Sequence, residues 1–310
     1  MQFINPKTDF AFKRIFGSEQ NKDILISFLN GILYEGKSTI KNLEILNPYQ
    51  APKIRGVKDT YLDVKAVLDN EQTVIIEMQV LNVEGFEKRI LYNAAKSYSM
   101  QLEIGQDYTL LNPVIALTIT DFKMFSNFEK PISRFILKER DFLVDYTIYD
   151  LELVFVELPK FAKELDEVET LTEQWIYFLK SAAKANEVPE KIGRVAEIRK
   201  AFAVANIATL NREELEELEQ RELYIIDQRN AIKRAEKQAL EQGLQQGLEQ
   251  GLQQGLEQGL EQGLEQGLEQ GLKQKALEIA MRLLDILDEA NISQITGLSL
   301  AEVQRLKEER

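Results

Sequence analysis

Two polar side chains interrupt an otherwise apolar stretch of the chain, and their types are those that bind metal ions or move protons. Residues 74–81 read VIIEMQVL, in which six of the eight residues are apolar. A run of this kind, bounded by polar residues, predicts a strand buried on both faces. Glu77 and Gln79 lie two positions apart and therefore share one face of that strand. Because an ionised carboxylate buried alone costs several kcal/mol, Glu77 needs a partner.

A second carboxylate faces Glu77 if the preceding strand pairs with this one. Residues 60–70 alternate apolar and polar side chains, and the DNE stretch at 69–71 has the composition of a turn. A hairpin centred there sets Asp63 opposite Glu77, with the Cβ atoms about 5 Å apart. Two carboxylates at that distance repel each other unless a proton or a cation lies between them. Oxygen ligands suit Mg²⁺ or Mn²⁺, and Gln79 would orient a water beside the metal. The alternative is an acidic pair on a solvated face.

The residues that the chain lacks exclude several kinds of site. Its 310 residues, 44% of them hydrophobic, include no histidine and no cysteine. This excludes a Ser-His-Asp triad, imidazole metal ligands and thiolate zinc sites. No apolar run approaches the roughly 18 residues that span a bilayer, and no signal peptide is visible. We therefore expect a cytoplasmic protein that has no membrane partner.

The net charge of −13 is unevenly distributed along the chain. Residues 1–100 hold 13 Lys and Arg against 12 Asp and Glu, a balance of +1, whereas the remainder holds 25 against 39, a balance of −14. A phosphate-binding face in the first hundred residues is thus compatible with an acidic chain.

The order of predicted elements indicates an α/β domain of about 165 residues followed by a helical extension. The expected helices cover residues 8–16, 20–34 and 84–104, and the expected strands cover 39–50, 60–70, 72–81, 113–120 and 147–157. The expected divisions are a core over 1–165, a helical region over 166–240, repeats over 241–272 and a helical tail over 273–310.

Residues 241–272 repeat the tetrapeptide Glu/Gln-Gln-Gly-Leu eight times. Each interior glycine costs a helix about 1 kcal/mol relative to alanine, so eight cost about 8 kcal/mol. The segment is either a flexible linker or a helix stabilised by a partner that approaches closely at the glycines. Four residues advance a helix by about 400°, so the leucine stripe drifts about 40° per repeat and predicts right-handed coiling.

Five blocks, in this order, resemble the Rpn family of recombination-promoting nucleases or putative transposases, within the PD-(D/E)XK nuclease superfamily. The blocks are KTDFAFKRIFG, LDV, IIEMQ, KRILYNAAKSYSMQL and VELPKF. The resemblance covers about residues 1–180, and short Gln-Gly-Leu repeats are also typical of that family. It implies a restriction-endonuclease-like core, in which helices flank a mixed sheet.

The resemblance also implies roles for individual residues. Asp63 and Glu77 would bind the metal with help from the Met78 carbonyl, and Gln79 would occupy the third motif position, where the superfamily more commonly has lysine. A neutral amide does not offset phosphate charge in a transition state. Lys65, two residues beyond Asp63 on the same face, would then supply that charge, unless it is a solvated edge lysine.

A polar stripe on the following helix predicts contacts with DNA phosphates. Residues 88, 92 and 96 share a face at helical spacing, although exposed basic stripes are also common without such a role. The candidates are Lys88, Arg89, Tyr92, Lys96 and Gln101.

The leading hypothesis is a Mg²⁺-dependent (or Mn²⁺-dependent) DNA endonuclease linked to DNA recombination or to mobile-element or defence processes. It would form a homo-oligomer, expected to be a dimer, through the C-terminal helical tail. One alternative is a catalytically weakened nuclease fold that acts as a DNA-binding or regulatory oligomeric protein. Another is an interaction protein whose repeats assemble subunits.

Overall fold

The computed structural model describes residues 1–50 and 60–309. The chain forms two compact units, Met1–Ala231 and Ile232–Arg310. The finer division of the chain at residues 165, 240 and 272 stays a prediction.

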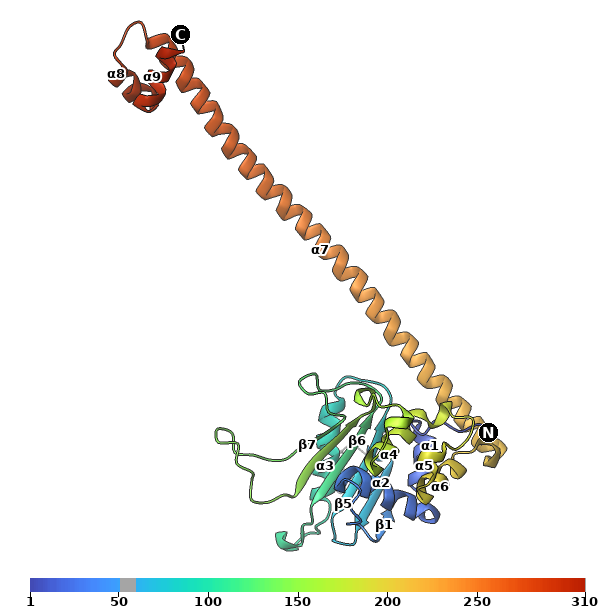
Figure 1. Ribbon diagram of the computed structural model, residues 1–310. Coiled ribbons are helices and arrows are strands. Elements are labelled where there is room, and N and C mark those ends of the chain that lie inside the picture. The colour runs from blue at the N-terminus through green and yellow to red at the C-terminus, as the bar shows by residue number, and fades with distance from the viewer. Residues whose placement is uncertain (51–59, 310) are drawn as a thin grey trace. The chain divides into compact units, whose positions relative to one another are not determined.

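A six-stranded mixed sheet lies at the centre of the first unit (Figure 1), in the order β1-β4-β5-β6-β8-β7. Strands β5, β6 and β8 run parallel, whereas β1, β4 and β7 are antiparallel to their neighbours. The bounds are β1 Leu43–Leu46, β4 Val64–Leu68, β5 Thr73–Gln79, β6 Val114–Thr120, β7 Ile132–Phe135 and β8 Leu151–Glu157. A separate two-stranded sheet pairs β2 (Tyr49–Gln50) with β3 (Thr60–Tyr61).

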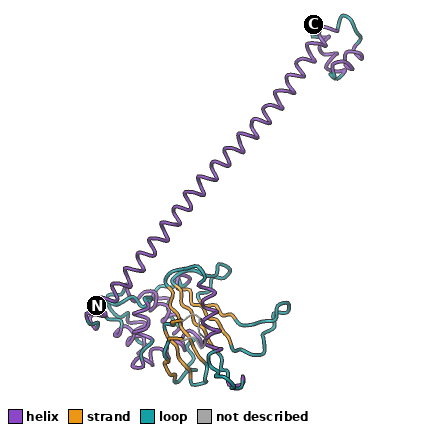
Figure 2. Tube along the Cα trace, turned by 180° about the vertical axis from the view of Figure 1, so that it is seen from behind, coloured by secondary structure: helices purple, strands orange, loops and turns teal. Residues whose placement is uncertain are grey.

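Helices cover both faces of the sheet, and Figure 2 shows the strands between them from the opposite side. Helix α3 packs Phe86, Ile90 and Ala94 on one face. The other face carries the larger apolar core, to which α1, α2, α4 and α6 contribute. The bounds are α1 Asp9–Phe16, α2 Lys22–Tyr34, α3 Phe86–Ser99, α4 Leu171–Ser181, α5 Glu190–Gly193 and α6 Ala196–Val204. The expected restriction-endonuclease-like architecture is confirmed.

Strand β5 contributes to both cores because its side chains alternate. Val74, Ile76 and Met78 join the larger core, whereas Ile75 joins the core beneath α3. Glu77 and Gln79 have the same parity as Ile75 and therefore belong to the α3 face. This alternation decides which helix can supply partners to the two polar side chains.

The pairing of β4 with β5 has the register that the sequence predicts. Val64 is paired with Ile76 and Lys65 with Ile75, which centres the hairpin on residue 70. Two expectations were wrong in detail. The strand expected over 60–70 is interrupted between β3 and β4, and the strand expected over 39–50 is divided at Pro48, which has no N–H for a ladder. Strand β7 was not expected from the sequence.

The repeats are helical in the structure. Helix α7 (Arg212–Leu283) begins in the first unit and extends into the second, which contains residues 241–272. The repeat leucines are 65–75% exposed, and a Cβ built on any repeat glycine would meet no described atom within 4 Å apart from the helix's own backbone. The end of α7 packs with α8 (Glu289–Thr296) and α9 (Leu300–Glu308) around a small apolar cluster.

No helix within residues 1–50 and 60–309 combines the length and apolar character that crossing a membrane requires.

The separate apolar cores generate a prediction about truncation. A chain ending at Ala235 keeps the whole first unit, including Leu218, which is buried in its core. It should unfold cooperatively, with a melting temperature within about 2 °C of the corresponding transition of the full chain, measured by circular dichroism. The control is a chain ending at Leu210, which lacks Leu218 and should be less stable, since losing a buried leucine side chain costs about 2–5 kcal/mol. An unfolded chain 1–235 would show that the core depends on the second unit.

Candidate active site

Asp63 lies where the β4–β5 ladder ends, and its side chain replaces a backbone partner there. The Asp63 N–H donates to the Ile76 carbonyl at 3.2 Å. The Met78 N–H, the next ladder donor along β5, donates to Asp63 Oδ2 at 2.8 Å. The carboxylate is therefore fixed beside the edge of β5. The Met78 carbonyl lies on the same strand edge as its N–H, as the predicted metal site requires.

Glu77 points to the α3 face of the sheet, where α3 supplies two partners. Glu77 is only 9% exposed. Asn93 Nδ2 donates to Glu77 Oε1 at 2.5 Å, and Arg89 Nη2 lies 3.8 Å from Glu77 Oε2. Gly85 immediately precedes α3 and sets the direction in which the helix begins. Its φ of +79° lies in the left-handed region that favours glycine.

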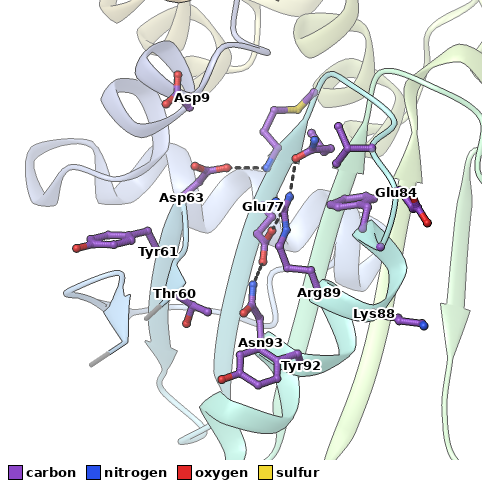
Figure 3. Close-up of a pocket in the computed structure, with 15 residues that line it drawn as sticks. Asp9, Thr60, Tyr61, Asp63, Glu77, Glu84, Lys88, Arg89, Tyr92 and Asn93 are labelled. Atoms are coloured by element: carbon purple, nitrogen blue, oxygen red, sulfur yellow. Dashed lines mark hydrogen bonds and ion pairs between the residues drawn. The ribbon is translucent and has the colours of Figure 1, made fainter. Parts of the chain in front are cut away.

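The two carboxylates line one cavity of about 970 Å³, shown in Figure 3. Seven of the residues singled out from the sequence line it: Asp63, Glu77, Met78, Gln79, Lys88, Arg89 and Tyr92. Figure 3 shows Arg89 extending from α3 toward Glu77, while Lys88 points away from it.

Three predicted site residues are not among those lining the cavity, and their roles stay predictions. Lys65 is half-buried on β4, where burial lowers its pKa. Lys96 is buried and donates from Nζ to the Gln50 carbonyl at 2.9 Å. The Gln101 amide donates to the Asn112 carbonyl and accepts from its N–H, both at 2.8 Å, which ties the end of α3 to the start of β6.

Helix α1 adds two charged residues that sequence reasoning did not place at the site. Asp9 lines the cavity, and Lys13 Nζ lies 3.4 Å from Asp63 Oδ1. Their spacing of four residues puts both on one face of α1, and Thr8 caps the helix just before them. Nothing in the local pattern indicates which strand that face meets, because about 50 residues separate α1 from Asp63.

The site disfavours two negative charges in the absence of a cation. Burial raises the pKa of Asp63 and that of Glu77 above their ordinary values. Asp63 raises the pKa of Glu77 further by repulsion, while the Met78 N–H and Lys13 oppose the rise at Asp63, and Asn93 and Arg89 oppose it at Glu77. A divalent cation bound between the carboxylates would offset both effects.

The donors present suit a hard cation that keeps most of its own waters. Among the described residues, no three Asp, Glu, His or Cys side chains converge as a metal-binding group. Two carboxylates and one backbone carbonyl, completed by waters, form the kind of incomplete oxygen set that Mg²⁺ accepts. In addition, the buried Oδ1 of Asn93 has no hydrogen-bond partner among the described residues, so the cavity offers an acceptor for water or ligand.

A mixed sheet flanked by helices, with a carboxylate pair at the end of a central strand, defines a restriction-endonuclease-like nuclease fold. Residues 6–235 match the family described as PD-(D/E)XK nuclease family transposase. The chain belongs to this family, which confirms the resemblance drawn from the five sequence blocks. Membership supports a nuclease-like function with DNA as the substrate class. Comparison with curated proteins and with solved structures gave no significant match.

The raised pKa values predict how the metal-free protein responds to pH. The folded state holds protons on Asp63 and Glu77 up to a higher pH than the unfolded state does. Stability is therefore lost as the pH rises through the raised pKa values. The double variant Asp63→Asn/Glu77→Gln removes both charges and should melt several degrees higher than the natural chain in EDTA at pH 7, at about 2–4 °C per kcal/mol.

That difference should shrink toward zero as the pH falls below the ordinary carboxyl pKa, because the natural pair is then neutral as well. The control is Glu190→Gln, which removes an exposed carboxylate and should change the melting temperature little. A double variant that melts lower than the natural chain at pH 7 would instead show that the charged pair anchors the fold.

Proposed function

We propose that this protein is a divalent-metal-dependent DNA endonuclease that acts in DNA recombination or in mobile-element or defence processes. The observation that carries the proposal is the convergence of two carboxylates in one cavity of a PD-(D/E)XK family member: Glu77 is buried, and Asp63, whose side chain is 15% exposed, raises the pKa of Glu77 by repulsion. A cation site explains why a folded protein retains such a pair. Hydrolysis would add water across one P–O bond of the backbone, leaving a phosphate monoester and a hydroxyl group.

Each residue then has a physical role. Asp63, Glu77 and the Met78 carbonyl would hold Mg²⁺ or Mn²⁺, which when bound would acidify water and offset phosphate charge. Asn93 orients Glu77 through its hydrogen bond, and the Met78 N–H orients Asp63 in the same way. Because these two donors fix the carboxylates before any cation arrives, little side-chain entropy remains to be lost on binding.

The rim of the cavity suits a nucleic acid. Lys88 and Tyr92 lie on α3, one turn apart, and both line the cavity with Tyr61 from β3. Lysine contacts phosphates in any sequence, and exposed tyrosine rings offer stacking surfaces to bases. We assign these contacts to Lys88 and Tyr92 of α3. Lys96 and Gln101 would instead hold the helix in place through their hydrogen bonds to Gln50 and Asn112.

A second candidate function rests on Gln79. Its amide stands where the superfamily commonly has lysine and brings no charge to the phosphate. A protein weakened in this way would bind metal and DNA without efficient turnover and would act as a DNA-binding or regulatory oligomer.

The two candidates differ in whether the metal-bound protein cleaves DNA. Purified full-length protein should nick or linearise supercoiled plasmid with Mg²⁺ or Mn²⁺ and not with EDTA. Glu77→Ala and Asp63→Ala should each lower the rate by at least about 10²-fold, the scale of removing one electrostatic element of catalysis. Both variants should also lose the rise in melting temperature that Mn²⁺ produces.

The control is Glu87→Ala, which removes an exposed carboxylate from α3 and should keep the natural rate. Cleavage at the natural rate by both alanine variants would contradict the assigned site. A natural chain that shows the Mn²⁺ shift and binds DNA but does not cut would select the second candidate.

The helical tail is where we propose that two copies associate, as a dimer. Six glutamates and no lysine or arginine occur within residues 241–272, so this segment repels DNA. The exposed leucines and open glycines favour another helix as the partner. Association would offset the helix penalty of about 8 kcal/mol, and the drift of the leucine stripe requires right-handed coiling.

Replacing all eight repeat glycines by alanine separates helix formation from close packing. The change should raise helix content, because each alanine favours the helix by about 1 kcal/mol. If the glycines admit a second backbone, the added methyl groups should also shift the protein from dimer toward monomer, as measured by light scattering at matched concentrations. The chain ending at Ala235 is the monomeric reference. Equal subunit counts for the natural, alanine and truncated proteins would leave the tail as a spacer.

A further inference from the structure

Gln79 occupies the third motif position, and both ends of its amide are already engaged. Its Nε2 donates to the Leu81 carbonyl at 2.7 Å, and its Oε1 accepts from Arg89 Nη2 at 2.8 Å. The first bond fixes the orientation of the amide, so its oxygen faces α3. The neutral amide brings no charge of its own, but its oxygen can hold a charged side chain in position.

The group that Gln79 holds is the guanidinium of Arg89. Besides the bond to Gln79, Arg89 lies 3.8 Å from Glu77 Oε2 and 5.1 Å from the centre of the Phe86 ring. Three neighbours thus restrain the guanidinium beside the carboxylate pair (Figure 3). Its side chain is still 44% exposed, and a guanidinium has five N–H donors, so donors remain for a ligand in the cavity.

Resting on the nuclease function proposed above, we infer that Arg89 is the catalytic cation of this site and that Gln79 is its positioning residue. An arginine from α3 would take the place of the lysine that is common at position 79. Arginine keeps its charge at any working pH and binds phosphate oxygens through two parallel N–H groups. Its restrained position means that little reorganisation is needed as charge develops on the phosphate.

Among the residues that the structure describes, the other cations near the site are placed less well for this role. Lys13 pairs with Asp63 from α1 and is not among the residues that line the cavity. Lys65 does not line the cavity, and Lys88 lines it but points away from Glu77. Within residues 1–50 and 60–309, Arg89 is the cation that contacts both Glu77 and the third motif residue.

The inference is tested by single-turnover cleavage and DNA affinity measured on full-length variants. Arg89→Met should lower the cleavage rate by about 10²–10³-fold, the range for removing one preorganised donor, while DNA affinity changes by less than about fivefold. Lys65→Met removes the competing cation, and its loss of rate should be smaller than that of Arg89→Met. Arg194→Met removes an exposed arginine far along the chain and serves as the matched control.

The role of Gln79 is tested by a double-mutant cycle with Arg89 and by moving the positive charge from position 89 to position 79. Gln79→Met should lower the rate through Arg89, so the double variant Gln79→Met/Arg89→Met should be no slower than Arg89→Met alone. Placing a lysine at the motif position, in Gln79→Lys/Arg89→Met, should raise the cleavage rate at least about tenfold above that of Arg89→Met. Arg89→Lys should fall between the natural chain and Arg89→Met, because it keeps the charge but loses the planar fork.

Mn²⁺ binding, which does not depend on turnover, shows whether Arg89 acts in catalysis or only maintains the structure of the site. Arg89 competes with a cation for Glu77, so Arg89→Met should bind Mn²⁺ at least as tightly as the natural chain, as judged by the rise in melting temperature on titration. Weaker Mn²⁺ binding would show that Arg89 only maintains the carboxylate geometry and would overturn the inference.

Three further outcomes would also overturn it: a natural rate in Arg89→Met, equal losses of rate and DNA affinity, or a large loss in Lys65→Met with none in Arg89→Met. If the natural chain itself does not cleave DNA, the proposed nuclease function fails instead, and the inference about its catalytic cation fails with it. That result is distinguishable from one in which the natural chain cleaves DNA and Arg89→Met cleaves it equally well, because only the inference about Arg89 then fails.

Discussion

The repulsion between two carboxylates that the fold keeps out of water is the constraint on which the site depends. Burial alone raises the pKa of Asp63 and of Glu77, and their proximity raises that of Glu77 again. Since desolvated like charges persist only when something compensates them, the surroundings of the pair are informative. A backbone N–H and Lys13 serve Asp63, and Asn93 and Arg89 serve Glu77. These partners oppose the rise of both pKa values without cancelling it.

The sheet brings those partners together because each face of its central strand meets a different set of helices. Side chains of one parity in β5 enter the core of α1 and α2, and those of the other parity meet α3. Glu77 and Gln79 therefore face α3, whereas Asp63, at the broken end of β4, remains within reach of Lys13 from α1. Phosphate would thus meet cations from both layers, held by helices that pack on opposite faces of one sheet.

The parts of this site that the sequence predicts are the parts set by local periodicity. Strand alternation and the turn near Asn70 predict the register that sets Asp63 beside Glu77. Contacts from Lys13 and Arg89 depend on how α1 and α3 dock, and no short-range pattern records that docking. Arg89 could be recognised as part of a basic stripe, but its bond to Gln79 required the structure. Strand β7 was missed because its four residues, ISRF, are too few for a clear period.

The charge and the glycine content of the tail support the proposal that it serves assembly and not binding of the substrate. Its repeat carries only negative charge, so it gains nothing from a phosphate backbone. Its helix retains eight glycines where alanine would be more stable by about 1 kcal/mol each, and among the described residues no atom outside the helix's own backbone lies within 4 Å of where their Cβ atoms would be. A helix that is weak alone and leaves a leucine stripe exposed becomes stable when another helix covers that stripe. Two active centres joined in this way could each cut one strand of a duplex, which a single centre achieves only by acting twice.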